Sequence, residues 1–361
     1  RYFDIDWHPP DAALDGKVLL PCLGVPYGDA LASGDITLGA DPSAGRFFIA
    51  CPGRRLPVAI ATYAEILRIA NRADLNALAE RFATASARGG PRVAAAHAAL
   101  RDYAAAQGPH AFDAILRGAD PRRARSRACL HRLLERQHYR LAWWRTAADE
   151  LNWRRFFDIA TLAAVRVEDD AVFDAVHALP LGLHAAGYID GLRVDHVDGL
   201  ADPRAYCRRL HARLAAQRDE RPYVVVEKIL APGETLRDDW RVDGTTGYDF
   251  MNDVAALLHD PAGAAPLAAH WTAVSGSARS FAQEAVAGKR RVLKRQLAGE
   301  HARVARALHR IARAAPATRD VSQIAIHRVL GELAVHLPVY RMYPTPGDEP
   351  AGADGRVLTL A

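Results

Sequence analysis

Two short apolar runs, each followed directly by a carboxylate, constrain the fold of this chain more than any other feature. YIDGLRVDHV (188–197) predicts a strand ending near Asp195, and PYVVVEKIL (222–230) predicts a buried strand ending near Glu227. Between them PRAYCRRLHARLAAQ (203–217) predicts an amphipathic helix. A helix that connects two strands of one sheet in this way makes those strands parallel, so the segment is predicted to form a βαβ unit.

The sequence around this unit alternates between strand-and-loop character and helical character. Residues 1–60 are rich in Gly and Pro with short apolar runs, which predicts strands and long loops. Residues 61–150 and 261–320 have apolar residues three and four apart and predict helices, as in CLHRLLERQHYRLAWWR. Residues 151–260 contain the βαβ unit, and residues 321–361 return to strand character in LAVHLPVYRMYP. The expected fold class is therefore α/β, a barrel-like domain with helical insertions at 61–150 and 261–320.

Composition excludes several classes of protein. The chain has 361 residues, half of them hydrophobic and a quarter charged, which suits one large domain with insertions or two domains. No apolar run approaches the ~20 residues of a membrane span, and no secretory leader is visible. Four scattered cysteines without C-x-x-C spacing predict neither a zinc site nor a disulfide framework. We expect a cytoplasmic protein with no membrane partner.

The formal net charge of +5 raises the question of a nucleic-acid partner. The densest basic stretch is PRRARSRACLHRLLERQHYR (121–140). A solvated helix face explains this stretch better, because no basic strand carries the interleaved aromatic residues that stack on bases. We expect no nucleic-acid partner.

Asp195 and Glu227 are the principal catalytic candidates, because working residues of parallel α/β sheets lie at the carboxyl ends of strands. Adjacent strands are about 4.8 Å apart, so the two carboxyl groups are expected about 5 to 5.5 Å apart, as in a retaining glycosidase. Arg193 lies two residues before Asp195 and so on the same strand face, where it favours and aims the ionised carboxylate. Three valines precede Glu227, and an apolar wall favours the protonated form that a general acid needs. A buried Arg–Asp pair with a capping Glu fits the same spacing.

A metal site is the competing chemical interpretation of this stretch. Asp195, His196 and Asp198 offer the oxygen and imidazole ligands that zinc or manganese accepts. No His-x-His or His-Glu-x-x-His motif stands elsewhere, and neither a G-x-G-x-x-G motif, a P-loop nor a Gly-x-Ser-x-Gly elbow is present. We therefore expect no metal and no cofactor.

Further residues are candidates for contacts with a sugar substrate. Aromatic rings stack on sugar faces, guanidinium groups donate to hydroxyls, and polar groups near the strand ends line pockets. These candidates are Trp143, Trp144, Trp153, Arg154, Arg155, His196, Asp198, Lys228, Tyr248 and Asp249. Several also have a structural interpretation, as core tryptophans, as an arginine paired with Asp158, or as a turn with an Asp cap.

A series of motifs resembles maltooligosyltrehalose synthase, a family of the α-amylase superfamily, and runs nearly from end to end. In chain order they are YFDIDW, LPCLGVPYG, HYRLAWWR, NWRRFFDI, GLRVDHVDGLADP, VVVEKIL, GTTGYDF and LPVYRMY. The resemblance implies a (β/α)8 barrel that converts the reducing-end α-1,4 bond of a maltooligosaccharide into an α,α-1,1 bond. It implies Asp195 as the nucleophile, Glu227 as the general acid/base and Arg193 as the residue that supports the nucleophile. It also implies a functional link to a trehalose-releasing hydrolase.

The chain departs from this family in extent and in two motifs. The early Asp-x-x-x-x-Asn-His stretch has no match, nor has the third carboxylate downstream of PVYR, so the chain is expected to be the middle portion of a longer enzyme. Asp198 and Gly199 stand where a plain amylase has a Lys-His pair, which suits this family. A hydrolase or branching enzyme on the same barrel, or a non-catalytic glucan-binding fragment, are the alternatives.

Overall fold

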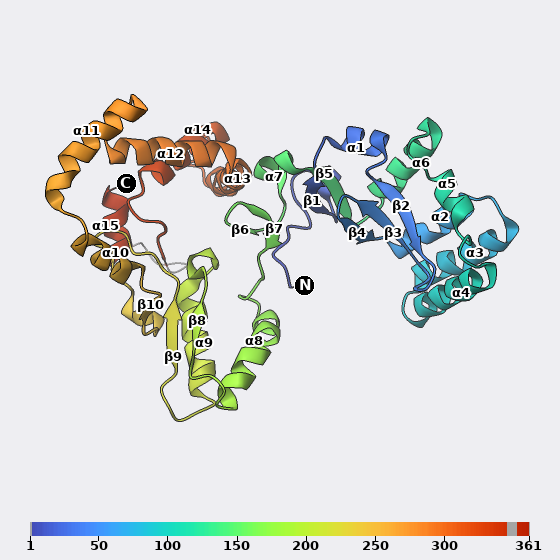
Figure 1. Cartoon of the computed structure of the whole chain (residues 1–361), viewed down its shortest axis with the longest axis horizontal. Coiled ribbons are helices and arrows are strands. Elements are labelled where there is room, and N and C mark those ends of the chain that lie inside the picture. Colours follow the sequence, from blue (N-terminus) through green and yellow to red (C-terminus); the bar gives the residue numbers. More distant parts are fainter. Residues whose placement is uncertain (1, 345–351, 361) are drawn as a thin grey trace. The chain divides into compact units, whose positions relative to one another are not determined.

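The computed structural model of this chain describes residues 2–344 and 352–360. The chain divides into two compact units, one of Ile5–Arg154 and the other of Arg1–Asp4 with Arg155–Ala361. Helices and strands occur in both (Figure 1), so the fold is mixed α/β, as the sequence predicts.

The unit Ile5–Arg154 contains two small sheets. Strands β1 (Val18–Leu23) and β5 (Tyr139–Trp143) pair in parallel, and β2 (Thr37–Asp41), β3 (Arg46–Cys51) and β4 (Arg54–Pro57) form an antiparallel sheet in that order. The helices are α1 (Tyr27–Ser33), α2 (Tyr63–Arg68), α3 (Ala73–Arg88), α4 (Pro91–Gln107), α5 (Asp113–Gly118), α6 (Ala124–Glu135) and α7 (Ala147–Glu150).

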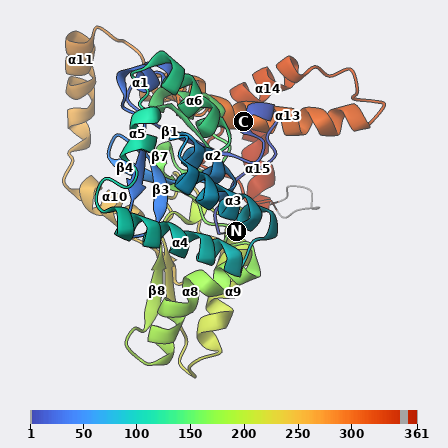
Figure 2. The same ribbon diagram turned by 90° about the vertical axis from the view of Figure 1, so that its right-hand side faces the viewer.

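Aromatic rings from the antiparallel sheet and the helices build the core of this unit. Leu75, Leu78 and Phe82 are buried along one face of α3, at the spacing of an amphipathic helix. The Phe82 ring stacks on Tyr63 of α2 at 4.7 Å between centroids, and Tyr63 meets Phe47 of β3 edge-on at 5.5 Å. Helix α4 runs alongside α3 and covers part of this core (Figure 2).

The prediction of helix throughout 61–150 is wrong at one place. Helix α6 ends at Glu135, and Tyr139–Trp143 form strand β5. Tyr139, Leu141 and Ala142 are buried there, because the segment pairs with β1 from the start of the chain. Burial against a strand far away in sequence thus outweighs the local three-and-four spacing.

The second unit carries the predicted βαβ order. Strands β8 (Gly191–Val194), β9 (Tyr223–Val226) and β10 (Gly244–Thr245) form a parallel sheet in the order β10-β9-β8 (Figure 1), and β6 (Arg155–Phe156) pairs with β7 (Ile159–Ala163) in antiparallel fashion. The helices are α8 (Asp170–Ala185), α9 (Pro203–Ala215), α10 (Tyr248–Leu257), α11 (Ala264–Ser275), α12 (Phe281–Arg295), α13 (Ala298–Ala314), α14 (Gln323–His336) and α15 (Gly352–Leu360).

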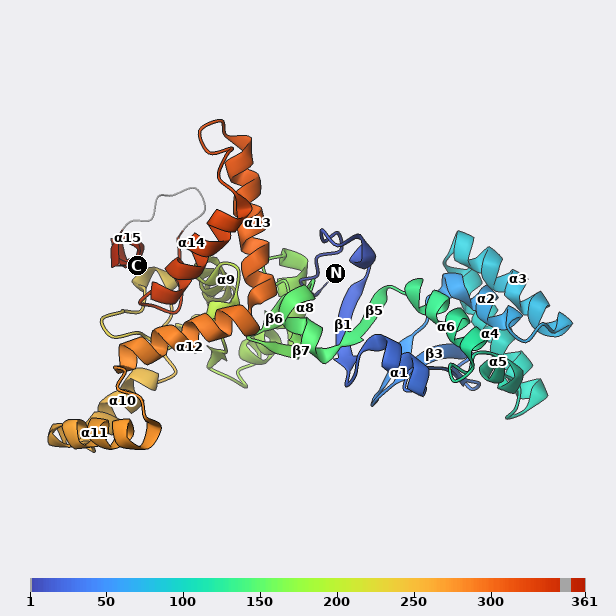
Figure 3. The ribbon, with the colours of Figure 1, turned by 90° about the horizontal axis from the view of Figure 1, so that it is seen from above.

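The sequence of this unit explains its helix boundaries. The side chains of Asp169 and Asp202 cap the N-termini of α8 and α9, and Pro203 occupies the first turn of α9, where its missing N–H costs nothing. Leu210 and Leu214 of α9 pack with Val224 of β9 in a buried cluster that fixes the crossover helix on the sheet. The predicted helical segment 261–320 is also confirmed, and α13 lies beside α14 (Figure 3).

The strand predicted within LAVHLPVYRMYP is wrong. Helix α14 continues to His336, and residues 337–344 have no regular secondary structure. Side-chain contacts replace a strand ladder: the Arg341 guanidinium donates to the backbone carbonyls of Asp198, Leu200 and Ala201.

The predicted closed barrel is not present among the described residues, whose strands form separate sheets of two or three strands. Short 3₁₀ turns connect the elements at Ala12–Leu14, Ile60–Thr62, Trp144–Thr146, Val197–Gly199, Asp238–Trp240 and Pro261–Gly263.

No helix in the described part of the chain has both the length and the apolar character needed to span a membrane.

Candidate active site

The carboxyl ends of β8 and β9 deliver the two candidate catalytic carboxylates. Val194 pairs with Val226 in parallel register, and the Glu227 N–H continues the ladder with a 2.8 Å hydrogen bond to the Val194 carbonyl. Asp195 and Glu227 therefore leave equivalent positions of neighbouring strands, as the βαβ spacing predicts. The distance between their carboxyl groups stays a prediction.

Arg193 and Asp195 form a close ion pair, with 2.6 Å between Nη1 and Oδ1. Their side chains are 49% and 59% exposed, so this is not the buried structural pair that the spacing also allowed. Exposed ion pairs contribute at most about 1 kcal/mol to stability. The contact therefore matters mainly because it orients the carboxylate oxygens of Asp195, and less because it stabilises the fold.

Glu227 is held by groups on both of its oxygens. Oε2 accepts a 2.7 Å hydrogen bond from the backbone N–H of His196, and Oε1 accepts from the Tyr248 hydroxyl at 3.4 Å. His196 has a φ of 44°, a conformation that residues other than glycine adopt rarely. Gly199 makes room for this turn, since a Cβ there would lie 2.4 Å from Cδ2 of the imidazole. Backbone strain of this kind is a frequent feature of functional sites.

A cavity of about 310 Å³ opens beside Glu227. Its lining combines carboxylates with apolar and aromatic groups: Phe157, His196, Asp198, Glu227, Ile229, Leu230, Ala231 and Tyr340. The Phe157 ring packs on His196 with 4.0 Å between centroids, and Phe157 also has a positive φ of 52°. An apolar cavity with a few convergent polar groups is the usual form of a small-molecule site.

Comparisons with known proteins place this site in context. No family model matches the chain. A Mycobacterium tuberculosis protein that bears the name maltooligosyl trehalose synthase is 47% identical over 135 residues, which are 37% of this chain and 17% of that protein. The structure of maltooligosyltrehalose synthase from Arthrobacter ramosus is 32% identical with a TM-score of 0.63, over 95% of this chain and 33% of that one.

The chain is homologous to a part of maltooligosyltrehalose synthase. It spans about a third of the length of the solved Arthrobacter synthase. A Sulfolobus tokodaii protein solved as a hypothetical maltooligosyl trehalose synthase, 22% identical with a TM-score of 0.62, covers 99% of this chain and 35% of its own and shares the fold. The resemblance inferred from the motifs is thereby confirmed.

Two of the predicted substrate contacts, Lys228 and Asp198, have side chains buried in an ion-paired cluster. The Lys228 side chain is 2% exposed, and its Nζ lies 2.8 Å from Oε1 of Glu234 and 3.6 Å from Oδ2 of Asp198. Asp198 Oδ1 also accepts a hydrogen bond from the Tyr343 hydroxyl. Asp198 reaches the cavity lining, whereas the Lys228 ammonium is occupied by protein partners, which does not favour a direct substrate contact for the lysine.

Arg155 has a structural environment as well. Its guanidinium side chain is 3% exposed, with Nε 3.0 Å from Oε1 of Glu300 and Nη1 donating to the Asp158 carbonyl at 3.2 Å. Arg155 therefore does contact Asp158, the alternative that the sequence allowed, but it binds the backbone carbonyl of Asp158 and not its carboxylate. These partners tie β6 to α13, and they leave the predicted sugar contact of Arg155 without support.

Tyr248 and Asp249, from the motif GTTGYDF, have different surroundings. The Tyr248 hydroxyl reaches Glu227, which brings it to the site. Asp249 accepts a 2.6 Å hydrogen bond from Thr245 Oγ1 in the first turn of α10, which lowers the pKa of this carboxyl. The N-cap of α10 is Gly247, without a side-chain cap, so neither the capping Asp nor the pocket contact is seen for Asp249, and the pocket contact stays a prediction.

The remaining candidates, Trp143, Trp144, Trp153 and Arg154, belong to the other compact unit. Trp153 is 5% exposed and donates from Nε1 to the Leu19 carbonyl at 2.8 Å, so it is a core residue. Trp144 is exposed, with the Arg145 guanidinium 5.2 Å from its ring. Trp143 donates from Nε1 to the Gly24 carbonyl at 3.1 Å.

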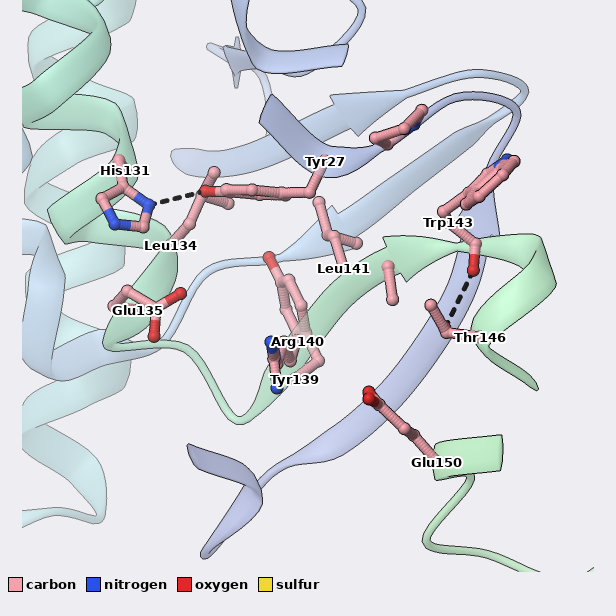
Figure 4. A pocket seen from close by; sticks show the side chains of 12 residues that line it. Tyr27, His131, Leu134, Glu135, Tyr139, Arg140, Leu141, Trp143, Thr146 and Glu150 are labelled. Atoms are coloured by element: carbon pink, nitrogen blue, oxygen red, sulfur yellow. Dashed lines mark hydrogen bonds between the residues drawn. The ribbon is translucent and has the colours of Figure 1, made fainter. Parts of the chain in front are cut away.

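Trp143 also borders a cavity of about 300 Å³ within that unit (Figure 4). The Tyr27 hydroxyl and His131 Nδ1 share a 2.9 Å hydrogen bond at one side of it, with Arg140 and Glu150 below. Burial raises the pKa of Tyr27 to about 12. The cavity joins α1, α6 and β5 and contains none of the residues around Glu227.

Sequence reasoning missed Phe157 and Tyr340 as individual site residues, although both lie in motifs that it singled out, NWRRFFDI and LPVYRMY. The aromatic residues of those motifs were the available signal. In the described part of the chain, no three His, Cys, Asp or Glu side chains are grouped so that they could hold a metal ion.

Proposed function

We propose that this chain carries the catalytic carboxylates of a maltooligosyltrehalose synthase, which converts the reducing-end α-1,4 bond of a maltooligosaccharide into an α,α-1,1 bond with retention. One observation carries the proposal: Glu227 follows β9 and is hydrogen-bonded to the backbone amide directly after Asp195, which follows the adjacent parallel strand. A retaining glycosidase needs two carboxylates that flank the bond it breaks, and the ends of neighbouring strands supply two here. The homology supplies the substrate class.

In the first step, a carboxylate oxygen of Asp195 attacks C1 of the penultimate glucosyl unit. The bond from C1 to the oxygen of the terminal glucose breaks, and Glu227 donates its proton to that oxygen. Arg193 holds the attacking carboxylate in place through its 2.6 Å contact with Oδ1. The products are a glycosyl-enzyme ester and a glucose molecule that stays in the site.

In the second step, the released glucose reorients within the site. Its anomeric hydroxyl then attacks the same C1, from the face that the glucose left in the first step. Glu227, now a carboxylate, takes the hydroxyl proton, and the bond from C1 to Asp195 breaks. Water is neither consumed nor released, so it has to be kept out, or hydrolysis replaces transfer. The apolar lining by Phe157, Ile229 and Leu230 suits that requirement.

In this proposal β8, β9 and β10 are strands of a (β/α)8 barrel, and the segment 61–150, apart from β5, and the helical segment 261–320 are insertions in it. The site then lies at the carboxyl ends of the barrel strands, as in other barrels of this kind. The four cysteines are free thiols, which agrees with a cytoplasmic enzyme, and the product is a substrate for a trehalose-releasing hydrolase.

The test is to incubate the complete enzyme, with whatever sequence flanks residues 1–361 in its gene, with maltopentaose. Loss of reducing ends without release of free glucose supports the proposal. A rise in reducing ends identifies a hydrolase instead. Binding of maltopentaose with no turnover, unaffected by the substitution Glu227→Gln, identifies a glucan-binding protein.

A further inference from the structure

A buried cluster of charges includes two residues that lie close in sequence to the proposed catalytic carboxylates. It consists of Asp198, Lys228 and Glu234, whose side chains are 8%, 2% and 14% exposed. The Lys228 ammonium lies between the two carboxylates, 2.8 Å from Oε1 of Glu234 and 3.6 Å from Oδ2 of Asp198. One cation thus serves two anions in a site nearly closed to water.

Each carboxylate of this cluster has a further donor. The Tyr343 hydroxyl donates to Oδ1 of Asp198, and the backbone N–H of Ala231 donates to Oε2 of Glu234 at 2.9 Å. Buried charges are expensive unless they are paired and hydrogen-bonded, and here they are. Lys228 is ion-paired with both carboxylates, so removing its ammonium takes away the charge that links Asp198 to Glu234.

The cluster connects the two loops that carry the proposed catalytic residues. Asp198 belongs to the turn that follows Asp195 and His196, and Lys228 follows Glu227 directly. The Arg341 guanidinium secures the same turn by donating to the Asp198 carbonyl at 2.7 Å. The ion pair between Lys228 and Asp198 is therefore a side-chain link between the two strand ends, next to the backbone link from His196 to Glu227.

We propose that Lys228 is a positioning residue for catalysis, which holds Glu227 against the His196 turn by binding Asp198 and Glu234. The expected effect of Lys228 on turnover rests on the proposed function, whereas its expected effect on the position of Glu227 does not. Lys228 acts through Glu227 and not on the sugar, because its ammonium is enclosed by protein groups. A lysine at this position is thus required for turnover more than for substrate binding.

The first test compares Lys228→Met with Lys228→Arg in the complete enzyme acting on maltopentaose. In Lys228→Met we expect kcat to fall about 10²-fold, the loss typical of a misplaced catalytic group, while KM changes less than about threefold. Lys228→Arg keeps the charge and should recover at least about a tenth of the wild-type kcat. The control is Lys17→Met, which removes another ion-paired lysine, 3.3 Å from Glu135 in the other unit, and should leave kcat unchanged.

The second test does not depend on the reaction. Hydrogen exchange of the His196 amide reports its hydrogen bond to Glu227, and in Lys228→Met we expect exchange at least about tenfold faster, with the β9 amide of Val226 unchanged. If Lys228→Met does not fold, Glu234→Gln, which removes one anion and keeps the lysine, should give a smaller change in the same direction.

The outcomes separate the two proposals. Wild-type kcat together with wild-type exchange in the folded variants overturns the role of Lys228. A rise in KM at unchanged kcat also overturns it, because it indicates a substrate contact. If the wild-type enzyme does not act on maltodextrins and exchange at His196 still accelerates in Lys228→Met, the proposed function fails while the positioning role stands.

Discussion

The backbone N–H of His196 and the carboxylate of Glu227 are joined by a 2.7 Å hydrogen bond, which links the ends of two neighbouring parallel strands. The donor residue His196 has a left-handed backbone, and Gly199 lies against its ring, where a Cβ would be 2.4 Å from the imidazole. The position of one catalytic candidate thus depends on the turn that follows the other. This relationship leads to tests of both residues.

Replacing Glu227 with Gln should reduce turnover of maltodextrins by about 10²- to 10⁴-fold, since an amide cannot donate and accept the proton that general acid–base catalysis transfers. Substrate binding should persist, because the amide keeps nearly the same shape. Turnover and calorimetric binding of maltopentaose in the complete enzyme provide the measurements. A purified variant with near-normal turnover contradicts the assignment.

Replacing Arg193 with Ala should also impair turnover strongly, by about 10²-fold, because Asp195 loses the partner 2.6 Å from its Oδ1. Stability should change by less than about 1 kcal/mol, since the pair is exposed. Arg221→Ala is the matched control, for it breaks another Arg–Asp pair, with 2.6 Å to Asp243, near the other end of the same sheet. Equal kinetic effects of the two substitutions would show that Arg193 has no special relation to Asp195.

Replacing Gly191 with Ala should destabilise the β8–β9 pair. A Cβ at this position would lie 2.0 Å from the Tyr223 carbonyl oxygen, a backbone atom that cannot rotate away. We expect a loss of about 1–3 kcal/mol in the free energy of unfolding, the usual cost of overpacking. Gly244→Ala in β10 of the same sheet is the control, because nothing lies within 4 Å of its added Cβ. Denaturant titration of both variants decides, and equal midpoints would refute the argument.

His177 should make the unit that contains β8 and β9 less stable in mild acid. Its Nε2 accepts from the Tyr206 hydroxyl at 2.8 Å, its Nδ1 contacts the Phe173 carbonyl at 2.8 Å, and burial lowers the pKa of the imidazole below its usual 6.5. In the unfolded chain the imidazole of His177 takes up a proton near its ordinary pKa, whereas in the folded chain burial disfavours the protonated form. The contribution of this group is therefore present above about pH 6.5 and is lost as the pH falls below it.

The measurement for His177 is thermal unfolding of the wild-type chain and of His177→Gln between about pH 5 and pH 7.5. The melting temperature of the wild type should fall more steeply with acidification, because glutamine offers an acceptor to Tyr206 and does not titrate. Identical slopes in the two proteins would exclude His177 as a source of acid sensitivity.

The sequence alone determined the βαβ unit and the positions of its carboxylates. Apolar runs of β-branched residues, an amphipathic helix with a capping Asp202 and Pro203, and the rule that a crossover connects parallel strands are all local or topological signals. Strand alternation then placed Arg193 on the side of Asp195, where the ion pair is found. The motifs also identified the homology that the comparisons confirm.

The tertiary structure alone decided what those residues meet. Tyr139–Trp143 became a strand because β1 offers it a partner, and the segment around Arg341 stayed irregular because the carbonyls after β8 bind its guanidinium. Lys228, predicted as a substrate contact, is buried against Glu234. Tyr343 reaches Asp198 across 145 residues of sequence. Burial and pairing at such separations depend on how the chain packs, and no local pattern of residue types encodes them.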